Sequence, residues 1–172
     1  IKCPVYATKF AKLLIENRLK EFNKVEGFSL NEINLYKKLL LKNFSLDFIP
    51  TTHSIPEPSA IVISTAYGSL LHTADWKIDY SPTIGNSFSK AKFEELGNNG
   101  ILALIGDSTN ANTPGKSQSE NDVKEELVKI FSRYSNRIVV TCFSSNIARM
   151  KNIISAAKKN KRKVALVGRS MK

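Results

Sequence analysis

The sequence predicts an α/β fold, and three observations lead to this prediction. Apolar residues recur at helical spacing in residues 5–22, where Phe10, Leu13 and Leu14 can share one face. Two apolar, β-rich runs flank the turn "AYGS" at residues 66–69. Residues 137–170 alternate strand, helix and strand. Such a β-α-β unit predicts a parallel sheet with a right-handed crossover.

The elements of the first two thirds follow from local patterns. Residues 5–22 are predicted as a helix, and residues 31–55 as short strands separated by turns. The runs on either side of "AYGS" predict a β-hairpin. Residues 88–100 predict a short helix that ends at glycines. The run "ILALIGDST" at 101–109 predicts a buried strand with polar groups at its carboxyl end.

The last third has a more regular pattern. Residues 120–135 and 146–160 are predicted as helices, and "RIVVTCF" at 137–143 and "KVALVGRS" at 163–170 as parallel strands. A loop precedes this region, and the charge balance changes there as well. We therefore predict one domain over residues 1–118 and a second over residues 119–172.

Charge is spread unevenly along the chain. The formal net charge is +11, and the segment from Glu120 onward has 13 Lys and Arg against 4 Asp and Glu. A basic segment of this kind suits a polyanion such as nucleic acid, although a solvated basic surface is the alternative. Apolar residues make up 42% of the chain, but no apolar run is long enough to span a membrane.

Cys3 and Cys142 are too few and too far apart for a disulfide scaffold or a cysteine-type zinc site. We expect two buried, reduced thiols in a cytoplasmic protein. The first residues lack the apolar region of a signal peptide. The chain begins as if within a fold and stops just after a predicted strand, so we expect a segment cut from a longer protein.

The stretch "GDSTNANTPGKS" resembles two known kinds of site only in part. Gly115, Lys116 and Ser117 fit the end of a phosphate-binding P-loop, but Asn110 stands at the first glycine position. Pro114 also removes a backbone donor from the cradle. The Gly-Asp-Ser sequence resembles a serine esterase motif, but such a nucleophile needs a histidine base, and no Asp-x-x-His follows it.

Both histidines of the chain lie near the ends of β-rich runs. His53 and His72 flank the hairpin, and Asp75 follows His72 closely. Imidazole and carboxylate groups are the usual ligands of a hydrolytic zinc site, and loops after strands hold such ligands rigidly. A histidine with a structural role is the alternative.

Several short motifs together are more specific than any of them alone. "THSIPEP", "HTADWKID", "GDSTNA" followed by "PG" and "SE", "FSSNIARM" and "GRSM" occur in this order. In order and spacing the sequence resembles the ribonuclease J family, which belongs to the β-CASP branch of the metallo-β-lactamase superfamily. The resemblance implies the later part of an αββα metallo-β-lactamase domain, followed by the first half of an inserted, parallel-sheet β-CASP domain.

The resemblance implies roles for individual residues. His53 matches a ligand of one zinc ion, and Asp75 matches the carboxylate that bridges two zinc ions. Asp107 matches an acidic residue beside the metal centre, and His72 matches no ligand, so a structural role is expected for it. Asp79, in the same loop as Asp75, has no ligand role. RNA contacts are implied for Ser144, Ser145, Asn146, Arg169 and Ser170, at the edge where open α/β sheets bind ligands.

The sequence also departs from the family. Ala74 stands where glycine is usual, Glu57 where aspartate is usual, and Ala148 where histidine is frequent. The motif H-x-H-x-D-H, which supplies most zinc ligands in the family, does not occur in the sequence. We therefore interpret the chain as an internal segment of the enzyme, inactive alone.

The resemblance implies that the intact protein is a cytoplasmic, zinc-dependent 5′-to-3′ exonuclease and endonuclease. It would act in RNA processing and decay, including rRNA processing, with RNA as its partner. A homodimer or homotetramer is expected for the intact enzyme. The alternatives are a non-catalytic RNA-binding segment, or another β-CASP nuclease that acts on DNA or on messenger-RNA 3′ ends.

Overall fold

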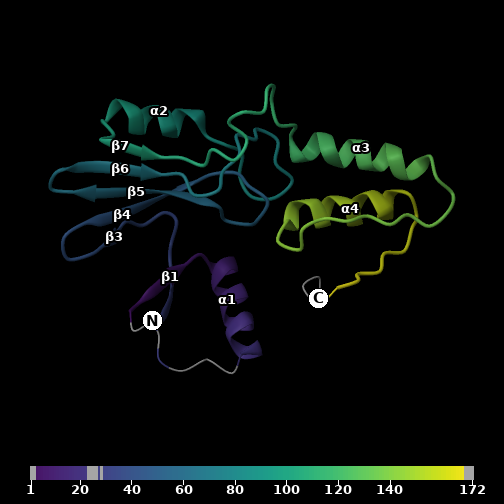
Figure 1. The fold of residues 1–172 in the computed structure, drawn as a ribbon, viewed down its shortest axis with the longest axis horizontal. Coiled ribbons are helices and arrows are strands. Elements are labelled where there is room, and N and C mark those ends of the chain that lie inside the picture. Colours follow the sequence, from purple (N-terminus) through teal and green to yellow (C-terminus); the bar gives the residue numbers. More distant parts are fainter. Residues whose placement is uncertain (1–2, 23–26, 28, 169–172) are drawn as a thin grey trace. The chain divides into compact units, whose positions relative to one another are not determined.

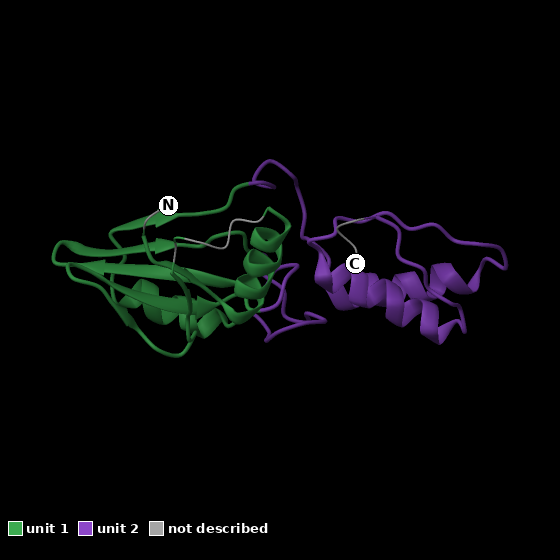
Figure 2. Ribbon diagram, turned by 90° about the horizontal axis from the view of Figure 1, so that it is seen from below, with its two compact units in different colours: residues 1–51, 57–76, 89–108 green, residues 52–56, 77–88, 109–172 purple. Residues whose placement is uncertain are grey.

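The computed structural model describes residues 3–22, 27 and 29–168 and confirms a mixed α/β fold (Figure 1). The chain forms two compact units that alternate along the sequence (Figure 2). Unit 1 contains residues 1–51, 57–76 and 89–108, and unit 2 contains residues 52–56, 77–88 and 109–172. The predicted domain division between residues 118 and 119 remains a prediction.

Unit 1 is built on a five-stranded sheet with the order β3-β4-β5-β6-β7. Neighbouring strands are antiparallel except β6 and β7, which are parallel. The strands are β3 (Leu39–Leu40), β4 (Ser45–Pro50), β5 (Ser59–Thr65), β6 (Gly68–His72) and β7 (Ala103–Ile105).

The predicted hairpin is confirmed as β5 and β6. Thr65 pairs with Gly68, so Ala66 and Tyr67 form the two-residue turn. Gly68 has φ +136°, a conformation that residues with a Cβ atom rarely adopt. The register places Ile61 opposite His72, and it thereby fixes the position of the loop that follows β6.

Helix α2 (Lys90–Asn98), predicted from the sequence, covers one face of this sheet (Figure 1). Ser89 caps its start by accepting a hydrogen bond from the Lys92 N–H at 3.4 Å. Its residues Phe93 and Leu96 pack on a buried cluster contributed by β4, β5 and β6. This cluster consists of Ile49, Ala60, Val62 and Leu71.

The prediction of a buried strand at 101–109 is correct for the strand and wrong for its burial. All three residues of β7 are exposed, including Leu104 and Ile105. The reason is its place at the edge of the sheet, where no described strand pairs with its outer side.

The first predicted helix begins later than expected. Val5–Ala7 form strand β1, and α1 (Lys9–Glu21) starts after the cap residue Thr8. Strand β1 pairs in parallel with β2 (Leu30–Glu32). The expectation of a buried thiol is wrong for Cys3, which is exposed.

Unit 2 contains the two predicted helices, α3 (Glu120–Ser132) and α4 (Ile147–Lys159). They lie side by side (Figure 2) and pack through Phe131 on α3 and Ala156 and Ala157 on α4. A capping box starts α3. The Ser119 side chain accepts the Asp122 N–H, and the Asp122 side chain accepts the Ser119 N–H. Among the described residues, no helix combines the length and the apolar character needed to cross a bilayer.

The two strands predicted in this region are not formed. Residues 137–143 and the described part of 163–170 run as extended chain without strand pairing, and residues 169–172 lie outside the described part. The two segments, Phe131 of α3 and one face of α4 line a cavity of about 580 Å³. A strand needs a paired neighbour to be stable, and the described residues supply none to either segment.

Candidate functional site

The carboxyl ends of β6 and β7 carry two of the predicted site residues, Asp75 and Asp107. The buried residue Thr73 joins the loops that follow these strands. Its N–H donates to the Ile105 carbonyl at 3.0 Å, and its hydroxyl accepts the Asp107 N–H at 3.0 Å. The same hydroxyl donates to the Ala74 carbonyl at 2.8 Å. Thr73 thus brings the backbones of both acidic segments to one edge of the sheet.

A tight turn holds Asp75 at this edge. Ala74 has φ +52°, in the left-handed region that favours glycine. Its N–H donates to Nδ1 of His72 at 2.9 Å, so this nitrogen is an acceptor and the ring proton lies on Nε2. His72 therefore supports the turn before Asp75, while the Asp75 side chain is exposed to solvent.

His53 lies in unit 2, in the segment Thr52–Pro56. Its ring is half-buried, and Nδ1 lies 3.2 Å from the Ser54 hydroxyl. Thr52 fixes the segment before His53: its carbonyl accepts the Lys77 N–H at 2.8 Å, and its hydroxyl accepts the Asp79 N–H at 3.1 Å. Ser54 fixes the segment after it, because its carbonyl accepts the Ala148 N–H of α4 at 3.0 Å.

Three of the five residues predicted to contact RNA, Ser144, Ser145 and Asn146, lie at the start of α4. Asn146 is the N-cap, and its side-chain oxygen accepts the Arg149 N–H at 2.8 Å. The Ile147 N–H donates to the Ser145 carbonyl at 3.1 Å, and Ala148 donates to Ser54. Protein groups thus already occupy three N–H donors of this helix start. Ser144 and Ser145 precede the cap, and the remaining predicted residues, Arg169 and Ser170, lie outside the described part of the chain.

Sequence reasoning assigned no ligand role to Asp79 and missed its structural role. Asp79 is buried, and its carboxylate accepts the Glu120 N–H at 2.9 Å and the Ser81 N–H at 2.9 Å. The ammonium group of Lys77 lies 3.5 Å away. The available signal was local: an aspartate two residues before a serine in a turn-rich stretch often accepts that residue's N–H.

Burial raises the pKa of Asp79, but the surrounding donors outweigh this effect. The hydrogen bonds from Glu120, Ser119 and Ser81, together with the Lys77 charge, hold the pKa below its ordinary value of 3.8. The carboxylate is therefore ionised in the folded protein at neutral pH, where it stabilises the start of α3.

The donor types fit a zinc ion, but the described residues hold no complete site. An imidazole at His53 and carboxylates at Asp75 and Asp107 are suitable zinc ligands and partners. Within the described residues, however, no group of three or more His, Cys, Asp or Glu side chains is placed to hold a metal ion. Among the described residues, these donor types therefore do not by themselves define a metal site.

Comparison with known proteins gives consistent matches. The family model "Ribonuclease J, beta-CASP domain" matches residues 135–172. Ribonuclease J of Sinorhizobium meliloti is 39% identical over 175 residues, which cover 100% of this chain and 30% of that protein. Ribonuclease J of Thermus thermophilus is 40% identical, and Ribonuclease J2 of Bacillus subtilis 33% identical; they cover 98% and 99% of this chain and 30% and 31% of their own lengths. The chain thus spans about a third of the length of these relatives.

A solved structure shares the fold at low sequence identity. The crystal structure of a protein of unknown function from Enterococcus faecalis aligns with a TM-score of 0.63 at 17% identity. The alignment covers 88% of this chain and 39% of the other. At this identity the match supports the fold and nothing about the chemistry.

Replacing Asp79 should destabilise unit 2. Asp79→Ala leaves the Glu120 and Ser81 N–H groups without their acceptor, which should cost about 1–3 kcal/mol of unfolding free energy. The contribution of this carboxylate is full above pH 3.8 and is lost as pH falls through the lowered pKa. Denaturant unfolding from pH 3 to 7 should show a smaller loss of stability on acidification in Asp79→Asn than in the wild type. Equal acid dependence in both proteins contradicts the prediction.

Replacing alanine by glycine should not lower the stability at position 74, but it should lower the stability at the helical position 91. Ala74→Gly relieves a left-handed alanine, worth about 1–2 kcal/mol, against an entropy cost of about 0.5–1 kcal/mol. Stability should therefore stay unchanged or rise. The control Ala91→Gly, at an exposed position of α2, should cost about 1 kcal/mol. A loss at position 74 as large as that at position 91 would show that the turn is not strained.

Proposed function

Because the chain is homologous to ribonuclease J over its whole length, we propose that it forms part of a metal-dependent ribonuclease. The observation that carries the proposal is this match of about 40% identity across the chain, which includes the segments of His53, Asp75 and Asp107. The chain spans only part of these relatives, so the activity belongs to the longer protein. The fold we propose is part of a metallo-β-lactamase domain followed by part of a β-CASP domain.

In this proposal His53 and Asp75 are zinc ligands and Asp107 supports the metal centre. A bound zinc pair would supply an activated water for attack on a phosphodiester. The residues of this chain prepare that site: Thr73 ties the Asp75 and Asp107 backbones together, and His72 holds the turn at Ala74. The remaining ligands would come from parts of the protein outside this sequence.

The basic last third would hold the RNA. Lys158, Lys159, Lys161 and Lys163 are exposed at and beyond the end of α4, where their charges are available to phosphates. Arg162 has a different role, because its guanidinium donates to backbone carbonyls that include those of Phe131 and Asn136. At the start of α4, Ser144, Ser145 and the Asn146 amide would contact RNA through side-chain groups, with Arg169 and Ser170 at the next segment.

We propose 5′-to-3′ exonucleolytic and endonucleolytic cleavage in RNA processing for the intact protein, acting in the cytoplasm as a dimer or tetramer. The alternative is a segment that binds RNA without cutting it. In the nuclease, Asp75 is needed for cleavage. In an RNA-binding segment, Asp75 has no part in catalysis.

Loss of Asp75 should abolish cleavage and leave RNA binding nearly unchanged. In the full-length protein that contains this chain, Asp75→Ala and Asp75→Asn should lower the cleavage rate by roughly 100-fold or more, because a lost metal ligand costs at least as much as a lost supporting group. The assay uses RNA with a 5′ monophosphate, alongside zinc content, an RNA-binding titration and circular dichroism.

Asp47→Ala is the matched control for this experiment. Asp47 is a half-buried aspartate of the same unit, and its carboxylate forms an ion pair with the exposed residue Lys38 at 2.9 Å. Its loss should change the cleavage rate by less than about twofold. A folded Asp75→Ala protein that cuts RNA as fast as the wild type would refute the metal role.

RNA binding by this chain should be mainly electrostatic. About three phosphate contacts, each contributing a slope of ~0.7, predict a roughly 20-fold loss of affinity for a fourfold rise in salt. The double variant Lys158→Glu/Lys161→Glu should bind single-stranded RNA more weakly and with a smaller salt slope. Lys37→Glu/Lys42→Glu, with the same change in net charge at exposed sites of unit 1, should bind nearly as well as the wild type. Equal losses in both variants would contradict a local basic site.

A further inference from the structure

The segment that carries His53 is held from both sides by groups of unit 2. On one side, the Thr52 hydroxyl donates to the Lys77 carbonyl and accepts the Asp79 N–H. On the other side, the Ser54 carbonyl accepts the Ala148 N–H at 3.0 Å. The position of His53 therefore depends on two anchors, the 77–79 segment and the first turn of α4.

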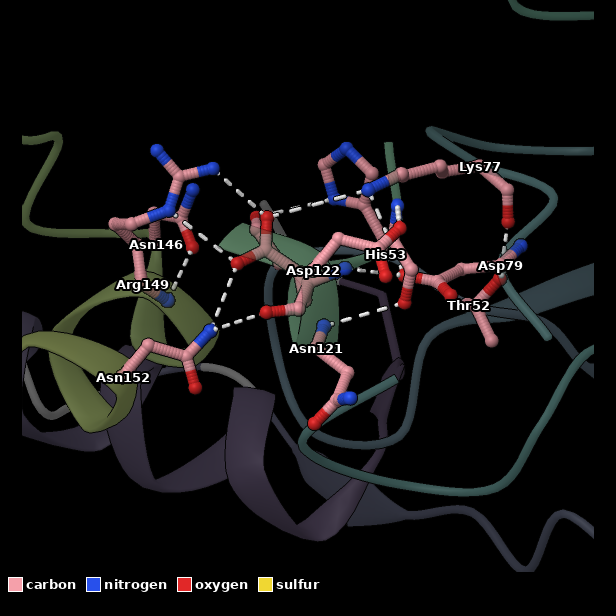
Figure 3. A network of polar contacts seen from close by, with 12 residues as sticks. Thr52, His53, Lys77, Asp79, Asn121, Asp122, Asn146, Arg149 and Asn152 are labelled. Atoms are coloured by element: carbon pink, nitrogen blue, oxygen red, sulfur yellow. Dashed lines mark hydrogen bonds and ion pairs between the residues drawn. The ribbon is translucent and has the colours of Figure 1, made fainter. Parts of the chain in front are cut away.

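Glu120 connects these two anchors. Its backbone N–H donates to Asp79, while its carboxylate accepts Nη2 of Arg149 at 2.9 Å and Nε at 3.3 Å. The Asn152 amide donates to the Glu120 carbonyl at 2.9 Å and to its carboxylate at 3.1 Å. In Figure 3 the labelled residues Thr52, Lys77 and Asp79 lie on one side of this network, and Asn146, Arg149 and Asn152 on the other.

The burial of Glu120 makes this connection specific. Glu120 is 8% exposed, and a buried carboxylate is stable only if cations and donors compensate it. The Arg149 guanidinium forms a bidentate contact with the Glu120 carboxylate, and Nζ of Lys77 lies 4.0 Å from Oε1 of the same carboxylate. The hydrogen bond with Glu120 in turn raises the pKa of Arg149. Glu120 thus links the 77–79 segment, through its backbone N–H to Asp79 and its carboxylate near Lys77, with the first turns of α4, through its carboxylate to Arg149 and Asn152.

We propose that Glu120 is a positioning residue for His53. It acts through Asp79 and Thr52 on one side of the histidine and through Arg149, Ala148 and Ser54 on the other. The inference rests on the proposed function for its chemical meaning, since that function makes His53 a metal ligand. Groups that orient metal ligands commonly change metal affinity or activity 10- to 100-fold when they are lost.

The chain contains two histidines, which makes a direct test possible. The rings of isotopically labelled His53 and His72 should give separate NMR signals in the 172-residue chain, without metal or RNA. Glu120→Ala should move or broaden the His53 signals, while His72, in unit 1, serves as the internal reference. Glu120→Gln, which keeps an oxygen for Arg149, should produce a smaller shift and so show partial rescue. Glu126→Ala, at an exposed ion pair on the same helix, should change neither signal.

Arg149→Lys is the second variant, for the case that Glu120→Ala does not fold. Lysine preserves the charge but cannot form the bidentate contact with Glu120, so the NMR signals of His53, and not those of His72, should shift again. The proposal is overturned if folded Glu120→Ala, or folded Arg149→Lys in its place, leaves the His53 signals at their wild-type positions. An equal change in the signals of both histidines overturns it as well. The readout needs neither zinc nor cleavage. Wild-type cleavage rates in Asp75→Ala would refute the metal-ligand role of Asp75 and leave the positioning role of Glu120 in place.

Discussion

The carboxylates at the start of α3 set the main physical constraint in unit 2. Asp79 and Glu120 are both buried, so each needs donors and cations that reach it inside the protein. These donors come from segments far apart in the sequence: Lys77 from one loop, and Arg149 and Asn152 from α4. Satisfying the two charges therefore forces these segments together. The His53 segment is hydrogen-bonded to the same set and is ordered by the same requirement.

The sequence predicted those elements that depend on interactions between residues close together in the chain. Both helices of unit 2 and the β5–β6 hairpin follow from apolar spacing, the N-cap residues and the glycine at position 68. The two extended segments of residues 137–143 and 163–168 have strand composition, but a strand also needs a partner, which composition does not reveal. The exposure of β7 likewise depends on sheet order. Asp79 was missed because burial of a loop carboxylate depends on contacts with Glu120, 41 residues away.

The departures from the family are local adjustments with visible consequences. Ala74 occupies a left-handed position, which is the physical reason that glycine is usual there. Glu57, also at positive φ, is one methylene longer than the usual aspartate, and its carboxylate accepts the Phe10 N–H in the first turn of α1 at 3.0 Å. Both positions lie outside His53 and Asp75, whose residue types match the pattern that the resemblance implies.

Ala148 shows how one small residue decides what the start of α4 can bind. It is fully buried, and its N–H reaches the Ser54 carbonyl. A histidine, frequent in the family at this position, would need more room than this fully buried position gives to alanine. A helix N-terminus attracts anions because its N–H groups lack partners, but here a protein carbonyl and the Asn146 side chain already use these groups. The helix start therefore holds the His53 segment, and in the function that we propose RNA phosphate would meet the hydroxyl groups before the cap and the lysines at the other end of the helix.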